Sequence, residues 1–354
     1  MYSQLIILSI IFIESSFGGG GDGCPPQLSG CECGIRPYGT SGRPTYVTNC
    51  TNQQFNQSAE QYMRHVPIET EVLLMVGNLF PQLSRNLLNQ SERYDKLYMV
   101  DLSRNGIETI HGQAFHNMRS VQILHLDHNN LSISDQHSKQ TIHPRIFSPL
   151  KSLEELHLRN TFSKTRYLNN SIELINSLTD LFHSTNLSLT LKLLNLESNH
   201  LTSLGSEQFF CQLSSIQRIR LADNLLTTYP INSSCLRWLS SIDLSSNMIV
   251  SMDQHSIDLI GSSGMERIGS LHVDLSDNPF RCDCSLLPFF RYIRNITSAT
   301  VDIRHVPKIE HVQRFRCSHQ STVSIDIKEN ILMISLNWIS IVHRRQRQQR
   351  HQHR

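Results

Sequence analysis

A short phrase recurs along the chain and constrains its fold more than any other feature. It reads VDLSRNGI up to Ile107, LHLDHNNL up to Leu131, LNLESNHL up to Leu201, IRLADNLL up to Leu226 and IDLSSNMI up to Ile249. Each copy places apolar side chains two residues apart, as one face of a short strand requires, and then an Asn where the chain must turn. Because one copy cannot bury its own apolar side chains, the copies must stack against one another.

The phrase matches the template LxxLxLxxNxL of leucine-rich repeats. In a degenerate fourth copy, LEELHLRNTF, Thr161 takes the place of the Asn. The other copies are marked by Asn78, Asn105, Asn129, Asn199, Asn224, Asn247 and Asn278, here called the ladder Asn residues. We expect these amides to bond buried backbone groups of their own and the neighbouring coil, a structural role. The sequence therefore predicts an α/β solenoid, a horseshoe of about eight coils whose strands form a parallel concave sheet.

The segments around the repeats predict the domain organisation. The apolar run LIILSIIFI, followed by small residues, indicates a secretory signal peptide over residues 1–21. An N-terminal cysteine-rich cap is then expected over 22–68, repeats over 69–278, a C-terminal cysteine-rich cap over 279–330 and a basic tail over 331–354. Two long gaps inside the repeats, 132–152 and 162–190, are rich in Ser, Thr, Asn and His. We expect these insertions to be excursions from the coils rather than additional core.

Composition and motifs argue against several functional classes. The formal net charge of +2 offers no basic excess for nucleic acid and no acidic block. No GxSxG, HExxH or GxxxxGKS run occurs, and the 18 His residues are spread along the chain. Zinc binding by Cys31 and Cys33 is disfavoured, because CxC without a second pair suits a tetrahedral site poorly. We therefore expect a non-enzymatic protein with no cofactor and no metal.

The nine cysteines fall into three groups. Cys24, Cys31, Cys33 and Cys50 precede the first coil, Cys211 and Cys235 lie within the repeats, and Cys282, Cys284 and Cys317 follow the last coil. Clusters at both ends predict disulfide-bonded caps. Cys211 and Cys235 are one repeat apart at equal phase, so we predict a bridge between them on the flank or convex side. The odd number leaves either a free or intermolecular thiol at Cys284, or an alternative ending of a longer protein.

Sequons agree with passage through the secretory pathway. Expected glycosylation sites are Asn56, Asn89, Asn130, Asn169, Asn186, Asn232 and Asn295. An eighth sequon, at Asn49, is the weakest because Cys50 follows it directly.

Taken together, these features resemble the extracellular part of animal leucine-rich repeat surface proteins. The resemblance rests on CECG at 31–34, the interrupted coil LEELHLRNT, LLNLESNHLTSL at 193–204 and LHVDLSDNPFRCDC at 271–284. It implies cap bridges Cys24–Cys33, Cys31–Cys50 and Cys282–Cys317, with Cys284 left without its usual mate. It also implies a cell-surface type I membrane glycoprotein that modulates Wnt signalling and affects adhesion and motility. The apolar run 331–342 is too short for the transmembrane helix of that class, so membrane attachment stays open.

Residues between the core leucines should point onto the concave sheet and form two exposed columns. The first column is Leu74, Asp101, His125, His157, Asn195, Arg220, Asp243 and Asp274; the second is Val76, Ser103, Asp127, Arg159, Glu197, Ala222, Ser245 and Ser276. Curved solenoids generally use this surface to bind partners. The simpler alternative is a solvated polar face.

The candidate binding residues are the central members of these columns. They are Asp101, His125, Asp127, His157, Arg159 and Arg220. Their mixed charge suits polar recognition of an extracellular protein ligand or co-receptor better than recognition of an apolar ligand. The prediction is a cell-surface or secreted glycoprotein that modulates Wnt-type signalling or adhesion; the alternative is a secreted matrix-binding protein.

Overall fold

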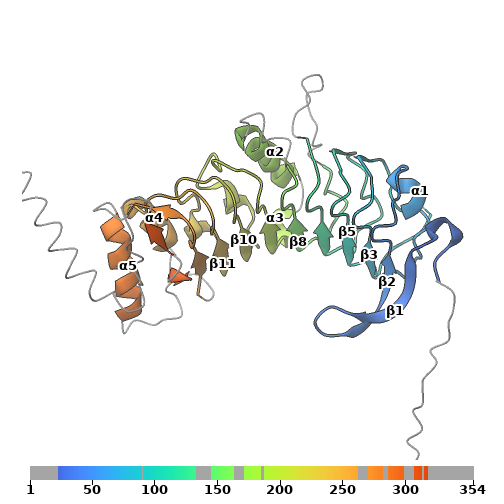
Figure 1. Ribbon diagram of the computed structural model, residues 1–354, viewed down its shortest axis with the longest axis horizontal. Coiled ribbons are helices and arrows are strands. Elements are labelled where there is room, and N and C mark those ends of the chain that lie inside the picture. Colours follow the sequence, from blue (N-terminus) through green and yellow to red (C-terminus); the bar gives the residue numbers. More distant parts are fainter. Residues whose placement is uncertain are drawn as a thin grey trace, which may run out of the picture.

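The protein folds as a curved leucine-rich repeat solenoid, as the repeats predict (Figure 1). The computed structural model describes residues 23–89, 91–132, 145–162, 171–184, 187–261, 270–281, 286–298, 307–312 and 315–317. Its main sheet has 11 strands in the order β1-β2-β3-β5-β7-β8-β9-β10-β11-β12-β14. Eight of them, β3 to β12 in this order, come from successive coils, which agrees with the predicted number.

The repeat strands are short, parallel and in register. They are β3 (Val72–Leu74), β5 (Met99–Asp101), β7 (Ile123–His125), β8 (Glu155–His157), β9 (Leu193–Asn195), β10 (Arg218–Arg220), β11 (Ser241–Asp243) and β12 (His272–Asp274). The middle residue of each strand is buried; examples are Val100 in β5 and Leu124 in β7. Successive side chains of a strand point to opposite faces, so the residues on either side of the inward-pointing middle residue face the concave side. The concave sheet is therefore one continuous surface built from eight separated pieces of sequence.

The ladder Asn side chains join consecutive coils through buried hydrogen bonds. Asn129 accepts from the backbone N–H groups of Asn105 and Ile107, at 3.0 Å each, and donates to the carbonyls of Leu102 and Leu126. At the degenerate fourth copy, Thr161 Oγ1 donates to the Leu126 carbonyl at 2.9 Å. The residue before each ladder position has positive φ: Gly77, Arg104, His128, Asn160, Ser198, Asp223, Ser246 and Asp277. A left-handed residue makes the turn, and the amide that follows satisfies the backbone groups exposed by it.

An antiparallel hairpin covers the N-terminal edge of the sheet. It consists of β1 (Glu32–Tyr38) and β2 (Arg43–Asn49), and β2 pairs in parallel with β3. Two disulfides, Cys24–Cys33 and Cys31–Cys50, hold the hairpin together, with the pairings expected from the resemblance. The 3-10 helix η1 (Pro26–Leu28) precedes it and α1 (Ala59–Met63) follows. The hairpin supplies partners for a strand edge that would otherwise stay open.

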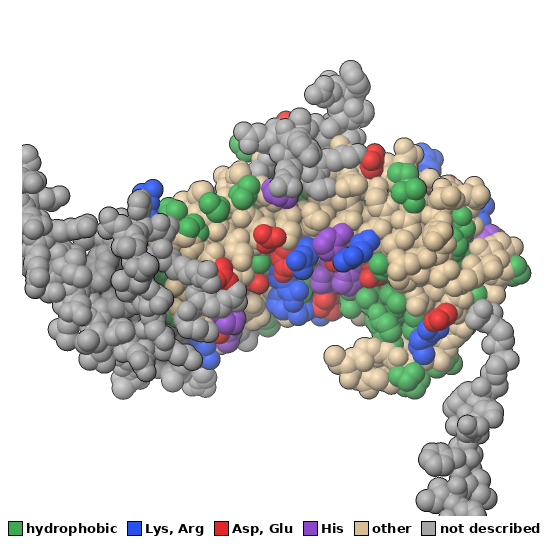
Figure 2. Space-filling view, in the orientation of Figure 1, with side chains coloured by type: hydrophobic (Ala, Val, Ile, Leu, Met, Phe, Trp, Pro, Cys, Tyr) green, Lys and Arg blue, Asp and Glu red, His purple; other side chains and the backbone are tan. Residues whose placement is uncertain are grey.

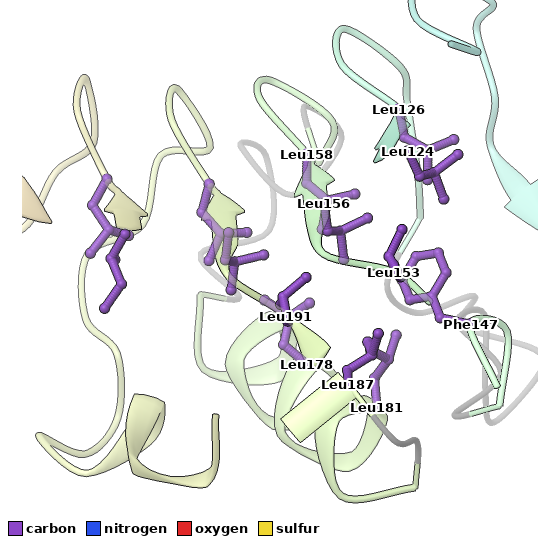
Figure 3. Packing of buried hydrophobic residues seen from close by; sticks show 14 of the residues in the cluster. Leu124, Leu126, Phe147, Leu153, Leu156, Leu158, Leu178, Leu181, Leu187 and Leu191 are labelled. Carbon is purple, nitrogen blue, oxygen red and sulfur yellow. The ribbon is translucent and has the colours of Figure 1, made fainter. Parts of the chain in front are cut away.

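The second insertion was predicted wrongly as an excursion without core. Its described part forms α2 (Ser171–Ser184) and α3 (Leu187–Thr190), on the side of the coils away from the sheet (Figure 1). Leu178 and Leu181 are each 1% exposed and pack toward the strand leucines (Figure 3). The expectation rested on the many polar residues of this insertion. Its apolar residues, however, recur at helical spacing and form one buried face of the helix. In the first insertion, Ile146 and Phe147 are buried in the same core.

A third disulfide, Cys211–Cys235, joins two neighbouring coils on the side away from the sheet. It confirms the bridge predicted from repeat phase, with a Cα–Cα distance of 5.4 Å. The two cysteines lie in the 3-10 helices η3 (Phe209–Gln212) and η4 (Ser233–Cys235). Helix α4 (Gln254–Gly261), in the coil of β11, contacts η4, and β4 (Gln82–Leu83) pairs in parallel with β6 (Thr109–Ile110) in a separate small sheet.

The C-terminal end packs an aromatic group against the last coil. It contains β13 (Pro279–Phe280), α5 (Leu287–Ser298), β14 (Lys308–Glu310) and β15 (Arg316–Cys317). Phe280 lies 6.0 Å from Phe289 and 5.3 Å from Phe315, between ring centroids. Strand β14 extends the main sheet beside β12. Cys282 and Cys284 lie outside the described residues, so the bridge Cys282–Cys317 stays a prediction.

Several other predictions fall outside the described residues. They are the signal peptide, the basic tail, Asn169 and Asn186. Of the expected glycosylation sites that lie within the described residues, Asn56 is exposed, and Asn89, Asn130 and Asn232 are half-buried. Asn295 lies in α5. None of the helices in the described ranges is long and apolar enough to cross a bilayer.

Candidate functional site

The strand registers align the predicted concave residues in one row. Asp101 pairs with His125, His125 with His157, His157 with Asn195, and Asn195 with Arg220. His125 and His157 therefore occupy the same position on neighbouring strands, although 32 residues separate them in sequence. Arg220 lies two strands beyond His157. The structure thus brings the two histidines together and keeps Asp101 and Arg220 on either side of them.

The concave columns are less exposed than the sequence predicted. His157 is 9% exposed and Asn195 is 3% exposed, although both point to the concave side. At His157 the cause is packing by its neighbours: the His125 ring stacks on it at 4.1 Å between centroids, and Glu155 lies beside it. The Asn195 side chain is used locally, because its Oδ1 accepts the Glu197 N–H at 2.9 Å. A partner docked on this face would contact only the small exposed parts of these two side chains.

His125, Asp127 and His157 form the centre of the face. His125 Nδ1 lies 3.4 Å from Asp127 Oδ2, and the other carboxylate oxygen of Asp127 accepts the Arg159 N–H at 2.7 Å. Burial alone would raise the pKa of Asp127, but the hydrogen bonds from His125 and from the Arg159 backbone outweigh it. The pKa of Asp127 therefore lies below its ordinary value, and the carboxylate carries its charge at neutral pH.

A second acid supports His157 from its own strand. Glu155 Oε2 lies 3.4 Å from His157 Nε2, and Glu155 Oε1 accepts from Arg218 Nη2 at 2.7 Å. The hydrogen bond from His157 and the charge of Arg218 hold the pKa of Glu155 below its ordinary value. An ionised Glu155 can only accept hydrogen bonds, so His157 must donate from Nε2.

Acids and bases alternate across the rest of the group. Arg159 Nη1 lies 3.6 Å from Glu197 Oε2, and burial raises the pKa of Glu197 despite the charges of Arg159 and Arg220. Figure 2 shows His, basic and acidic side chains gathered near the middle of the molecule, around the position that Figure 1 labels β8. The acidic and basic side chains of this group pair with one another, so the surface carries both signs of charge. Such a surface favours a partner whose own surface also carries both signs of charge.

A hollow beside the N-terminal hairpin was not predicted. It has a volume of about 640 Å³ and is lined by Tyr38, Arg43, Glu71, Tyr98, Met99 and Ile123, among others. Hydrophobic side chains lie between the hairpin and the charged centre in Figure 2. The sequence held a signal for it, because the turn residues GTSG separate two strand-like runs, IRPY and RPTYV. What the sequence did not show is that the hairpin overhangs the concave sheet.

The structure also groups three metal-ligating side chains where the sequence predicted no metal site. One ligand atom from each of His125, Asp127 and His157 lies within 4.8 Å of the others, and no other such grouping occurs among the described residues. Equal phase in adjacent coils was the available signal. It places the two histidines in one column, but their ring orientation and the position of the Asp127 carboxylate depend on side-chain packing.

Comparisons with known proteins agree with this architecture. A family model described as leucine rich repeat matches residues 95–161 and 190–249. No curated protein sequence matches the chain. The crystal structure of human 5T4, also titled Wnt-activated inhibitory factor 1 or trophoblast glycoprotein, is similar to this chain with a TM-score of 0.63 and 20% sequence identity. The alignment covers 85% of this chain and 94% of the human one. The likeness is one of fold: a leucine-rich repeat solenoid of the kind that typically serves protein interaction.

Proposed function

We propose that the chain is a non-enzymatic extracellular glycoprotein, at the cell surface or secreted, that binds another protein on its concave face. The observation that carries the proposal is the paired mixed-charge group around His125 and His157, at the centre of the only long sheet in the described part of the chain. Disulfides in the N-terminal cap and between coils support an oxidising compartment.

The proposed partner is a protein ligand or co-receptor in Wnt-type signalling or cell adhesion. The human structure with the same fold carries a Wnt-related title. The concave face suits such a partner, because a charged centre lies beside a hollow whose lining includes two tyrosines. Interfaces commonly combine aromatic anchors with a polar surround.

The test is a double substitution at the charged centre. We expect Asp127→Ala with Arg159→Ala to abolish the effect of the expressed chain on a Wnt reporter while leaving its export unchanged. The matched control is Arg93→Ala with Asp95→Ala, an exposed pair of the same charges in the loop before β5. Reporter activity and the amount of exported protein are measured for both. An unchanged reporter effect in the first variant would move the binding surface to the hairpin hollow or a flank.

The alternative is a secreted matrix-binding protein. It predicts accumulation in the medium or in insoluble matrix, with no reporter effect from the unaltered chain. Fractionation of expressing cells into membrane, medium and matrix distinguishes the two functions.

A further inference from the structure

We infer that His125, Asp127 and His157 form a binding site for a divalent transition metal ion, and specifically Zn²⁺, on the concave face. Each residue offers one ligand atom, and these three atoms lie within 4.8 Å of one another. Two imidazoles and one carboxylate are a typical donor set for zinc, with one position left for a further ligand.

Two of the ligand atoms already have the spacing that zinc requires. His125 Nδ1 and Asp127 Oδ2 are 3.4 Å apart. With metal–ligand bonds of about 2.0–2.1 Å, the edge of a tetrahedron is about 3.3 Å. In the absence of metal, His125 Nδ1–H donates a hydrogen bond to the ionised Asp127. An ion bound between the two atoms takes the place of that hydrogen, and the Nδ1 proton is released.

The third ligand needs only a side-chain movement. The His157 ring stacks on His125 with an interplanar angle of 22°. A ligand nitrogen of His157 lies within 4.8 Å of the ligand atoms of His125 and Asp127, so side-chain adjustment of this size brings the three atoms to one ion.

The neighbouring residues orient these ligands as an outer shell does in metal sites. Glu155 accepts from His157 Nε2, which leaves the lone pair of His157 Nδ1 for the ion. Glu155 is itself held by Arg218 at 2.7 Å. Asp127 Oδ1 is occupied by the Arg159 N–H, so Oδ2 remains available.

Charge and exposure are compatible with a cation. Two neighbouring guanidinium groups, those of Arg159 and Arg218, are paired with Glu197 and Glu155. The three ligand side chains are between 11% and 21% exposed, so they are largely shielded from solvent and still accessible from the concave side. Three protein ligands leave the fourth tetrahedral position open toward that side. If the proposed docking function also holds, a His or carboxylate of the docked protein can fill it.

The site is tested on the isolated full chain, without its partner and without an affinity tag. Chelator-stripped protein is titrated with ZnCl₂ by equilibrium dialysis, and bound zinc is counted by mass spectrometry. We expect His125→Ala with His157→Ala to bind one zinc ion fewer than the unaltered chain, because other histidines contribute equally to both. His272→Ala is the matched control: it removes a histidine of the same sheet that pairs with Glu310, and it should bind as much zinc as the unaltered chain.

Two single variants keep the test decisive if the double variant fails to fold. Asp127→Asn should weaken the affinity at least tenfold, and Glu155→Gln, which acts through His157, should weaken it by about 10–100-fold. Co²⁺ in place of Zn²⁺ should give the visible absorption of a four-coordinate ion in the unaltered chain and in His272→Ala, and not in the variant with His125→Ala and His157→Ala. Equal zinc content and affinity in all folded variants would overturn the site. Because no partner is present, that failure leaves the proposed docking function untouched, and loss of the reporter effect alone leaves the metal site untouched.

Discussion

At the scale of single residues, buried amides join one coil to the next. Asn224 accepts from the N–H groups of Asn199 and Leu201 and donates to the carbonyls of Leu196 and Leu221. A buried group left without a partner loses its hydration and gains nothing in return. Stacking therefore depends on a small number of polar side chains as well as on the leucines.

Replacing Asn224 with Ala should destabilise the fold by about 3 kcal/mol or more, because each unsatisfied buried group costs about 1–3 kcal/mol. Urea unfolding followed by circular dichroism measures the loss. Thr228→Ala, an exposed position in the same coil, is the control and should change stability by less than about 0.5 kcal/mol. Equal midpoints for the two variants would show that the amide does not hold the coils together.

A second residue-scale prediction concerns the start of α4. Asp253 Oδ1 accepts from the Ser256 N–H at 2.8 Å and from the Ser256 hydroxyl at 2.7 Å. These bonds hold the pKa of Asp253 below its ordinary value. Asp253→Ala should cost about 1 kcal/mol at neutral pH.

The sign of the pH dependence follows from that lowered pKa. The stabilisation by the charged cap is present above the unfolded pKa of about 3.9 and is lost as pH falls through the folded pKa. Unfolding of the unaltered chain and of Asp253→Ala should therefore converge in acid. Asp253→Asn, which keeps an acceptor without the charge, should lack this convergence; a constant gap for Asp253→Ala across the pH range would contradict the prediction.

At the scale of elements, the second insertion serves as part of the core. Helix α2 buries Leu174, Leu178 and Leu181 against the coils of β8 and β9, while Ile172 at its start is 64% exposed. The helix takes the place of the short outer segment found in a regular coil. An insertion can therefore lengthen a repeat without opening its core.

Leu178→Ala should destabilise the protein by about 2–5 kcal/mol, since it removes buried methyl groups and leaves a cavity. Ile172→Ala on the exposed face of the same helix is the matched control, with an expected change below about 0.5 kcal/mol. Thermal or urea unfolding compares the two. A small effect of Leu178→Ala would mean that the helix is an excursion after all.

At the scale of the whole molecule, each coil contacts mainly its neighbours, so damage should stay local. Removing the cap bridge with Cys31→Ser and Cys50→Ser should cost about 3 kcal/mol. Amide hydrogen exchange should become faster in β2 and β3 and stay unchanged in β10 and β11.

The reciprocal variant is the control for that prediction. Cys211→Ser with Cys235→Ser removes the bridge between the coils of β9 and β10, and it should accelerate exchange there and leave the hairpin unchanged. Faster exchange along the entire sheet in either variant would show that the solenoid unfolds as one cooperative unit.

The sequence by itself determined the repeat, the number of coils, the structural role of the ladder Asn residues and the bridge between Cys211 and Cys235. These features follow from a fixed period, because residues at equal phase in adjacent coils must lie side by side. The concave position of His125, Asp127, His157 and Arg159 followed in the same way.

Only the tertiary structure decided what surrounds those positions. The stacking of His125 on His157 depends on the distance between strands and on side-chain rotation, which periodicity does not specify. The buried face of α2 and the hairpin above the sheet depend on packing against coils distant in sequence. Insertions break the period, and where the period breaks, contacts in space determine the structure.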